Sequence, residues 1–230
     1  MGDQQAHFAN VERLMRLKHF SAASPPRKRA KIVAVCGLDG SGKSSLLKLL
    51  RDDPRFGRAV FVSKRSKENV NSVVQFCSDT EHPPDDYVRG PFAEAIRWAY
   101  AFDFLKFYEE EVLPHLGQEV LIISDRWSAC SITYAEAGTG LGDEIYQLLG
   151  CVPPPDLTVY LDVSPDEAVR RIVARGGQNE HEHVDILRGC ADAYERWWPK
   201  LSSPTARVER VINDDLEAAS RRTAALIEQL

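Results

Sequence analysis

One short segment, residues 31–50, constrains the fold of this chain more than any other. Its small and β-branched residues at 31–36 predict a buried strand, and the leucine pattern of 46–50 predicts one face of a helix. Between them, residues 37–44 read G-L-D-G-S-G-K-S and fit the phosphate-binding pattern G-x-x-x-x-G-K-[ST]. Glycines let successive backbone N–H groups point at a polyphosphate, and the helix adds the positive end of its dipole. The segment therefore predicts a nucleotide-binding loop.

The side chains of this loop suit the groups of a polyphosphate and its metal ion. Lys43 is expected to lie along the β- and γ-phosphates, and Ser44 to offer its hydroxyl to Mg²⁺. The rest of the loop is expected to surround the phosphates, through Gly37, Asp39, Gly40, Ser41, Gly42 and Ser45. The alternative is a chance glycine turn, which the β-branched strand before it and the amphipathic helix after it disfavour.

Size, charge and cysteine spacing exclude several classes of protein. The 230 residues, 43% of them hydrophobic, suffice for one α/β domain with a core and are few for two. The formal charge of −5 argues against a general binder of nucleic acid or membrane surfaces, so neither is an expected partner. The five cysteines form no C-x-x-C pair, and no apolar run suits a membrane span or a signal peptide. We therefore expect a cytoplasmic protein.

The first 30 residues are expected to form an extension ahead of a domain at 31–230. Apolar residues recur at helical spacing through 1–20 and predict a short amphipathic helix. Residues 21–29 read S-A-A-S-P-P-R-K-R, which is the composition of a linker. Its basic end fits a solvated tether better than a phosphate or partner patch. The helix could pack on a partner subunit or on its own domain, and the sequence leaves both open.

Two segments are candidates for the pocket of a second substrate. A short strand at 58–63 ends in the basic run K-R-S-K at 64–67, where Lys64 and Arg65 could contact a phosphate or lie in a solvated loop, with equal support. A long helix rich in aromatic residues is predicted over 91–116. Rings on a helix pack in the core more often than they bind a base, but these rings cover more than one face, so some are expected to line the pocket. The candidates are Trp98, Tyr100 and Phe104.

A buried strand at 119–124 delivers two charged residues at its carboxyl end, Asp125 and Arg126. The acid can hold the water shell of Mg²⁺ opposite the phosphate loop, and the guanidinium can fork onto a phosphate. A surface ion pair is the alternative. The position of both residues at the mouth of a buried strand, in a phosphate-loop protein, favours function.

The next strand, predicted at 157–163, leads into a helix that carries Arg171 and Arg175 ahead of a glycine break. Arginines in this position suggest a flap that closes over a triphosphate. They could instead form a solvated helix face, and the periodicity taken alone favours that alternative. Strands and helices alternate five times along the chain, and this alternation predicts a doubly wound parallel sheet.

In this order the motifs resemble those of thymidylate kinases, within the nucleoside monophosphate kinases. The resemblance rests on the phosphate loop with its internal aspartate, the D-R-W of 125–127, the helix and glycine-rich turn of 131–142, and the strand and cap of 155–165 with the arginines that follow. It implies an α/β P-loop kinase fold with a five-stranded parallel sheet, helices on both faces and a lid at about 170–182. It also implies a homodimer that transfers the γ-phosphoryl group of ATP to a nucleoside monophosphate.

The resemblance assigns donor-side roles to five residues. Lys43 and Ser44 would handle the phosphates of ATP and Mg²⁺, while Asp125 would organise Mg²⁺ and the acceptor rather than act as an essential base. Arg171 and Arg175 would belong to the lid. Such roles suffice for catalysis, because the transferred phosphoryl group passes through a loose transition state whose oxygens need cations around them.

On the acceptor side, the resemblance gives Asp39 the sugar hydroxyl, Arg126 the acceptor phosphate, and Tyr134 a place in the same site. The chain departs from the family where the base is read. Thymidylate kinases carry an arginine in an F-x-x-[DN]-R stretch of the long helix, and here Phe102 or Phe104 stands in its place. A phenyl ring cannot replace the hydrogen bonds of a guanidinium, so we expect a different acceptor, such as a modified nucleotide.

Two further departures leave other functions open. The family segment T-R-E-P-G-G-T is replaced by S-K-R-S-K-E at 63–68, and Glu180 occupies a basic position of the lid. One alternative is a kinase of a nucleoside or another small metabolite. The other is a nucleotide-binding regulator with little turnover, which Glu180 and the N-terminal helix would suit.

Overall fold

The computed structural model describes residues 30–64, 67–79, 92–176 and 184–230. The predicted N-terminal helix and its linker lie outside the described residues, as do Arg65 and the part of the predicted lid at 177–182, including Glu180.

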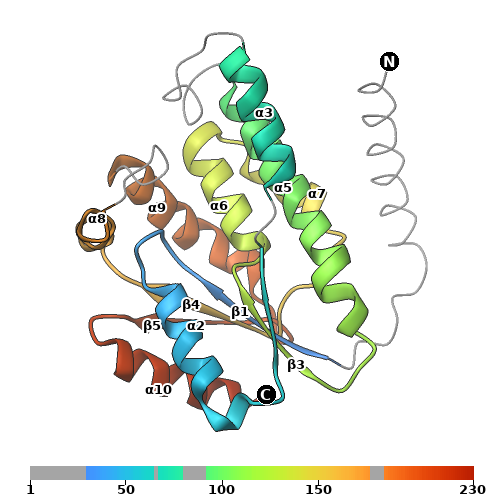
Figure 1. The fold of residues 1–230 in the computed structure, drawn as a ribbon, viewed down its shortest axis with the longest axis vertical. Helices are drawn as coiled ribbons and strands as arrows, with labels where there is room; N and C mark the ends of the chain where they lie inside the picture. Colours follow the sequence, from blue (N-terminus) through green and yellow to red (C-terminus); the bar gives the residue numbers. More distant parts are fainter. Residues whose placement is uncertain (1–29, 65–66, 80–91, 177–183) are drawn as a thin grey trace.

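Five parallel strands form one sheet in the order β2-β3-β1-β4-β5 (Figure 1). The strands are β1 (Lys31–Cys36), β2 (Val60–Ser63), β3 (Leu121–Asp125), β4 (Leu157–Asp162) and β5 (Arg207–Ile212). In the register of the sheet, Asp125 pairs with Val35 on one side and with Ser63 on the other. The residues that follow β1, β2 and β3 therefore meet at one edge, where open parallel sheets bind their ligands.

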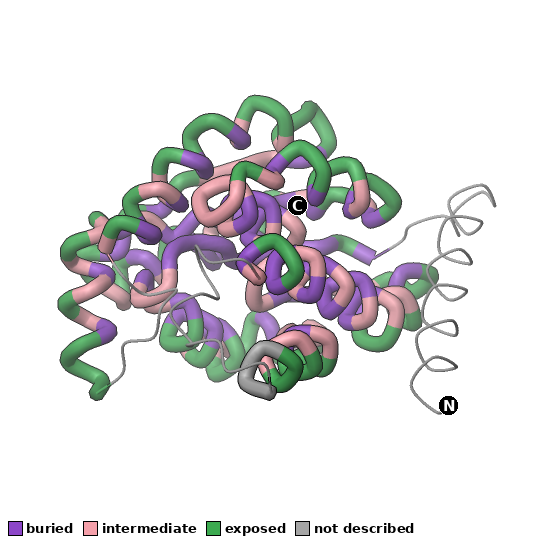
Figure 2. The backbone as a smooth tube through the Cα atoms, turned by 90° about the horizontal axis from the view of Figure 1, so that it is seen from above, coloured by how far each residue is buried: buried purple, intermediate pink, exposed green. Residues whose placement is uncertain are grey.

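Alternate residues of the central strand β1 bury opposite faces of the sheet, as the two-residue period of a strand requires. Val33 and Val35 join one apolar cluster with α2 (Lys43–Asp52) and α10 (Leu216–Ile227). Ile32, Ala34 and Cys36 join the other cluster. The helices that contribute to that cluster include α5 (Ala93–Phe107), α6 (Ser128–Thr139) and α9 (Val184–Leu201). Figure 2 shows the buried residues gathered on the strands and on the helix sides that face them.

The remaining elements connect these layers. They are the helices α3 (Glu68–Asp79), α7 (Gly142–Leu149) and α8 (Pro165–Ala174) and the short turns η1 (Pro54–Phe56), η2 (Tyr108–Val112) and η3 (Leu113–His115). The prediction of one continuous helix over 91–116 was wrong, because regular α-helix ends at Phe107 and gives way to a π turn and a 3₁₀ turn. Pro114 lies in the last turn and has no N–H to continue an α-helical ladder. None of the helices in the described ranges is long and apolar enough to span a bilayer.

A buried carboxylate ties α3 to α5. Asp103 is fully buried and accepts hydrogen bonds from the backbone N–H of Asn69 at 3.0 Å, from Asn69 Nδ2 at 2.8 Å and from the N–H of Val70 at 3.3 Å. These donors lie in the first turn of α3, whose N–H groups have no partner within the helix. Asp103 therefore fixes the start of α3, and with it the chain that leaves β2, against α5.

Candidate active site

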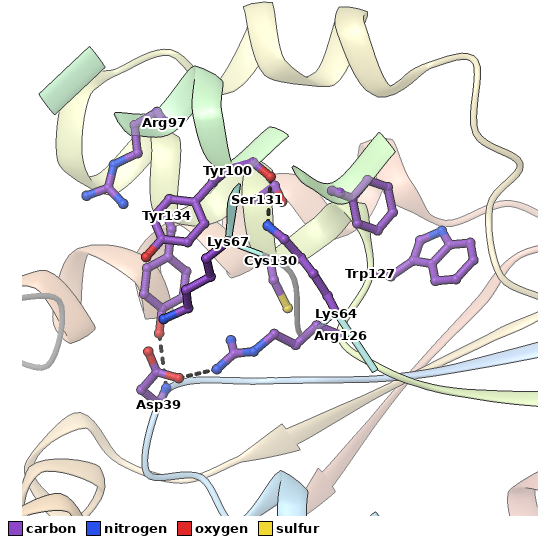
Figure 3. Close-up of a pocket in the computed structure, with 11 residues that line it drawn as sticks. Asp39, Lys64, Lys67, Arg97, Tyr100, Arg126, Trp127, Cys130, Ser131 and Tyr134 are labelled. Atoms are coloured by element: carbon purple, nitrogen blue, oxygen red, sulfur yellow. Dashed lines mark hydrogen bonds and ion pairs between the residues drawn. The ribbon is translucent and has the colours of Figure 1, made fainter. Parts of the chain in front are cut away.

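A cavity of about 180 Å³ opens at the carboxyl edge of the sheet, between the phosphate loop, the end of β2 and the helices α5 and α6 (Figure 3). Its charged lining residues are Asp39, Lys64, Lys67, Arg97 and Arg126. Its other lining residues are the rings of Tyr100, Phe104, Trp127 and Tyr134, together with Cys130 and Ser131. A cavity with four cations and one carboxylate suits an anionic ligand.

The phosphate loop has the backbone that its glycines predict. Gly40 has a φ of +83°, and a Cβ there would lie 2.3 Å from the carbonyl oxygen of Ala168. At Gly42, with a φ of +93°, a Cβ would lie 2.5 Å from Asn213 Nδ2. Gly42 is also the N-cap of α2 and supplies no side chain to its first N–H groups. The N-terminus of α2 therefore offers those N–H groups and its dipole to an anion.

Lys43 is held across the loop. Its Nζ donates to the carbonyl oxygens of Gly37 at 3.1 Å and Leu38 at 2.5 Å and to Ser41 Oγ at 3.3 Å. Burial lowers the pKa of Lys43 to about 8, and the nearby charge of Arg126 adds to the effect. Ser44 follows at the exposed start of the helix. The lysine is thus pre-positioned beside the loop amides that would surround a phosphate.

Asn213, which was not predicted from the sequence, follows the outermost strand β5 and supports the phosphate loop. Its side-chain Nδ2 donates to the carbonyl oxygen of Ser41 at 2.7 Å. Its main-chain carbonyl oxygen accepts a hydrogen bond from Arg171 Nη2 at 2.8 Å. Arg171 is also paired with Glu167 on α8, at 2.7 Å. Asn213 directly follows β5, at the ligand edge of the sheet, and this position could have identified it from the sequence.

The two arginines predicted for the lid therefore differ in position. Arg171 braces the phosphate loop through Asn213. Arg175 stands at the end of α8, and the structure does not bring it to the cavity.

Arg126 and Asp39 form an ion pair at the floor of the cavity, through Nη2 and Oδ1. The N–H of Asp39 also donates to Tyr134 Oη at 3.0 Å. Burial alone would raise the pKa of Asp39, but the charges of Arg126 and Lys43 outweigh it and hold that pKa well below its usual range. The structure thus brings Asp39, Arg126, Lys43 and Tyr134 together.

The backbone of Arg126 is unusual, with a φ of +74° that non-glycine residues rarely adopt. Two hydrogen bonds hold it there. The N–H of Arg126 donates to the carbonyl oxygen of Val35 at 2.9 Å, and Ser124 Oγ donates to the carbonyl oxygen of Arg126 at 2.8 Å. Strain of this kind persists where the surroundings enforce it, which is common at functional sites.

The carboxylate of Asp125 has an oxygen that is available for the predicted Mg²⁺ ion. Its Oδ1 is buried and has no hydrogen-bond partner in the described part of the chain. The described residues hold no group of three or more metal-ligating side chains. Mg²⁺ suits such a site, because it commonly takes one or two protein ligands and completes its shell with water and substrate phosphates.

Lys64 and Lys67 bring the end of β2 into the cavity. Lys64 Nζ donates to the carbonyl oxygen of Tyr100 at 2.7 Å and lies 4.9 Å from the centre of its ring. Burial lowers the pKa of Lys64 to about 8. Lys67 belongs to the basic run noted in the sequence but was not chosen as a candidate.

The long helix contributes Arg97, Tyr100 and Phe104, which are spaced i, i+3 and i+7 and so share one face. Trp98 is not among the lining residues. Trp98 lies two residues before Tyr100 and so faces another side of the helix. There its ring packs on that of Phe102, one turn further along, with ring centres 6.5 Å apart. The same spacing from Tyr100 and Phe104 could have identified Arg97, which the sequence analysis missed.

Residues 35–201 match the family model described as thymidylate kinase. The chain belongs to the thymidylate kinase family. Members of this family phosphorylate a nucleoside monophosphate with ATP as the donor, generally with Mg²⁺. The predicted family, the α/β fold and the nucleotide kinase activity are thereby confirmed.

Individual relatives agree with this assignment. A probable thymidylate kinase of Pyrobaculum aerophilum is 29% identical over 194 residues, which cover 82% of this chain and 96% of the relative. A probable thymidylate kinase of Pyrobaculum calidifontis is 30% identical over 164 residues, covering 70% and 79%. The solved structure of the Candida albicans thymidylate kinase matches with a TM-score of 0.66 at 18% identity, covering 87% of this chain and 92% of that one. At this identity the structural likeness supports the fold.

Proposed function

We propose that this thymidylate kinase family member transfers the γ-phosphoryl group of ATP to a nucleoside monophosphate whose base is not read as thymine is. The observation that carries the proposal is the basic cavity, whose Arg126–Asp39 pair lies beside the lysine of the phosphate loop. A donor site and an acceptor site thus share one edge of the sheet. We also expect a cytoplasmic homodimer.

On the donor side, Lys43 and the N–H groups at the start of α2 bind the phosphates of ATP. Ser44 and Asp125 would hold Mg²⁺, which would supply positive charge beside the phosphates. Arg171 positions the loop through Asn213. Arg175, at the end of α8, contacts the triphosphate as a residue of the lid.

On the acceptor side, Arg126, Lys64 and Lys67 bind the phosphate, and Asp39 accepts a hydrogen bond from the sugar. Tyr100, Phe104 and Tyr134 enclose the base. Phe104 offers no hydrogen bond to a base edge, whereas an arginine there would contribute about 1–3 kcal/mol of discrimination, by analogy with contacts to bases in DNA.

A screen of purified protein with ATP, Mg²⁺ and a panel of nucleosides and nucleoside monophosphates tests this function. We expect ADP release with monophosphates and not with nucleosides, and a better acceptor than dTMP. A clear preference for dTMP would refute the altered base site. Turnover with nucleosides alone would favour the nucleoside kinase, and tight ATP binding without turnover on any acceptor would favour the regulator.

The two lysines with lowered pKa values predict proton uptake on substrate binding. At about pH 8.5 a large part of Lys43 is neutral in the free protein, and a bound triphosphate favours its charged form, so ATP binding should take up a proton. Lys64 should do the same when the acceptor phosphate binds. Calorimetry in buffers of different ionisation enthalpy measures the uptake, which should fall steeply by about pH 7, where both lysines are mostly charged before binding. Equal heats in all buffers at the higher pH would contradict it, and Lys43→Met is the control for ATP.

A further inference from the structure

Arg97 forms one wall of the cavity and has no role in the phosphate chemistry described above. It lies on α5, one turn before Tyr100, and is only 3% exposed. In Figure 3 the rings of Tyr100 and Tyr134 lie between Arg97 and Arg126. Arg97 therefore belongs to the end of the cavity away from the acceptor phosphate.

Two nitrogens of the Arg97 guanidinium have no hydrogen-bond partner in the described part of the chain. Within the described ranges, its Nε and Nη2 are buried and make no hydrogen bond, and no carboxylate pairs with it. Its place is made by Gly138 on α6, where a Cβ would lie 2.7 Å from Nη2 and 3.0 Å from Nε. A buried guanidinium with unmade hydrogen bonds is costly, so its retention needs a reason outside the apo structure.

The neighbours of Arg97 do not compensate its charge. The groups that act on it electrostatically are Cys190, Tyr100 and Tyr134. Burial raises the pKa of each of these three groups, so all are neutral near pH 7. Burial also lowers the pKa of Arg97 itself, but a guanidinium stays protonated in proteins.

The charges of the whole cavity point the same way. Asp39 pairs with Arg126, and the carboxylate of Asp103 acts electrostatically on Lys64. In contrast, no carboxylate of the described residues acts on Arg97, which lies at the end of the cavity away from Arg126.

We propose that Arg97 binds a carboxylate carried by the base of the acceptor, so that the preferred substrate is an anionic nucleoside monophosphate. The inference rests on the proposed function. A neutral carbonyl would accept hydrogen bonds but leave the buried charge unpaired. A carboxylate supplies the missing negative charge and also accepts hydrogen bonds from the part of the guanidinium that lines the cavity.

Two acceptors of nearly equal size isolate the charge: uridine monophosphate with a carboxylate at C5, and the same nucleotide with a carboxamide at C5. The kcat/KM of the parent protein should favour the carboxylate by about tenfold or more, the range of a hydrogen bond to a charged group. Arg97→Gln should abolish this preference, and Arg97→Lys should keep part of it, because it retains the charge without the fork. Arg188→Gln on the exposed side of α9 is the control and should leave the preference unchanged.

Stability separates this role from a structural one. The thermal midpoint of ligand-free Arg97→Gln should equal or exceed that of the parent, because an uncompensated charge is removed, while protection by the carboxylated nucleotide should be lost. A fall in the midpoint with protection retained would overturn the proposal. So would equal use of the two nucleotides by the parent, a preference that survives Arg97→Gln, or rejection of both while other monophosphates react.

The same protection measurement keeps the two proposals apart. If no monophosphate accepts a phosphoryl group, the proposed function fails. Arg97 is then judged by heat protection alone, comparing the carboxylated and carboxamide nucleotides on parent and Arg97→Gln proteins.

Discussion

Lys43→Met is expected to lower kcat for phosphoryl transfer by about 10²–10³-fold, the loss typical of removing one charged or donor group from a developing transition state. Lys43 is held beside the loop amides by three hydrogen bonds and lies close to the ion pair that would hold the acceptor. Methionine has a similar length and no charge. Coupled measurement of ADP release at saturating ATP checks the result.

The matched control for this variant is Lys48→Met. Lys48 lies on the same helix but is exposed, so its replacement removes equal charge from the protein without touching the loop. It should leave kcat unchanged. If Lys43→Met kept parental turnover while the protein remained folded, the phosphate loop would have to be excluded from the chemistry.

Arg126→Ala is expected to lower kcat/KM for the acceptor by about 10²–10³-fold, since removing one partner of a buried charged contact typically costs about 2–5 kcal/mol. The variant removes the guanidinium and leaves Asp39 without its counter-charge. Alanine also carries a Cβ, so the substitution does not relieve the left-handed backbone at position 126, and a thermal melt of the variant checks that it is folded. Initial rates at varied acceptor concentration separate KM from kcat.

Arg126→Lys and Arg188→Ala complete the comparison. The lysine keeps the charge without the two-pronged geometry and should fall between parent and alanine variant. Arg188 is an exposed arginine of α9 and should have no effect. An unchanged acceptor KM in Arg126→Ala would instead favour a substrate without a phosphate, as in the nucleoside kinase alternative.

The phosphate loop and the strand ends could be predicted from the sequence because their signals are local. The pattern of 37–44 specifies its own backbone, and a buried strand followed by a charged residue places that residue at the ligand edge. Asp125 and Arg126 were found for this reason. Their distance from the loop follows from the parallel register of β1 and β3.

The residues that were missed depend on packing between distant segments. Asn213 reaches Ser41 across 172 positions of sequence, and Arg97 owes its place to a glycine on another helix. Trp98 was wrongly placed because aromatic content was read without the helical phase. The π turn after Phe107 has no simple sequence signature beyond the proline that follows it.

The anchoring of α3 by Asp103 has a consequence for how such a protein can diversify. Asp103 joins the start of α3 to α5, and α5 in turn packs on α6, so the walls of the acceptor cavity form one connected unit. The phosphate loop is held mainly by β1 and by Asn213, and it meets this unit through the hydrogen bond between Asp39 and Tyr134 on α6. Substitutions on α3, α5 and α6 can therefore change which acceptors bind while the phosphate loop keeps its structure.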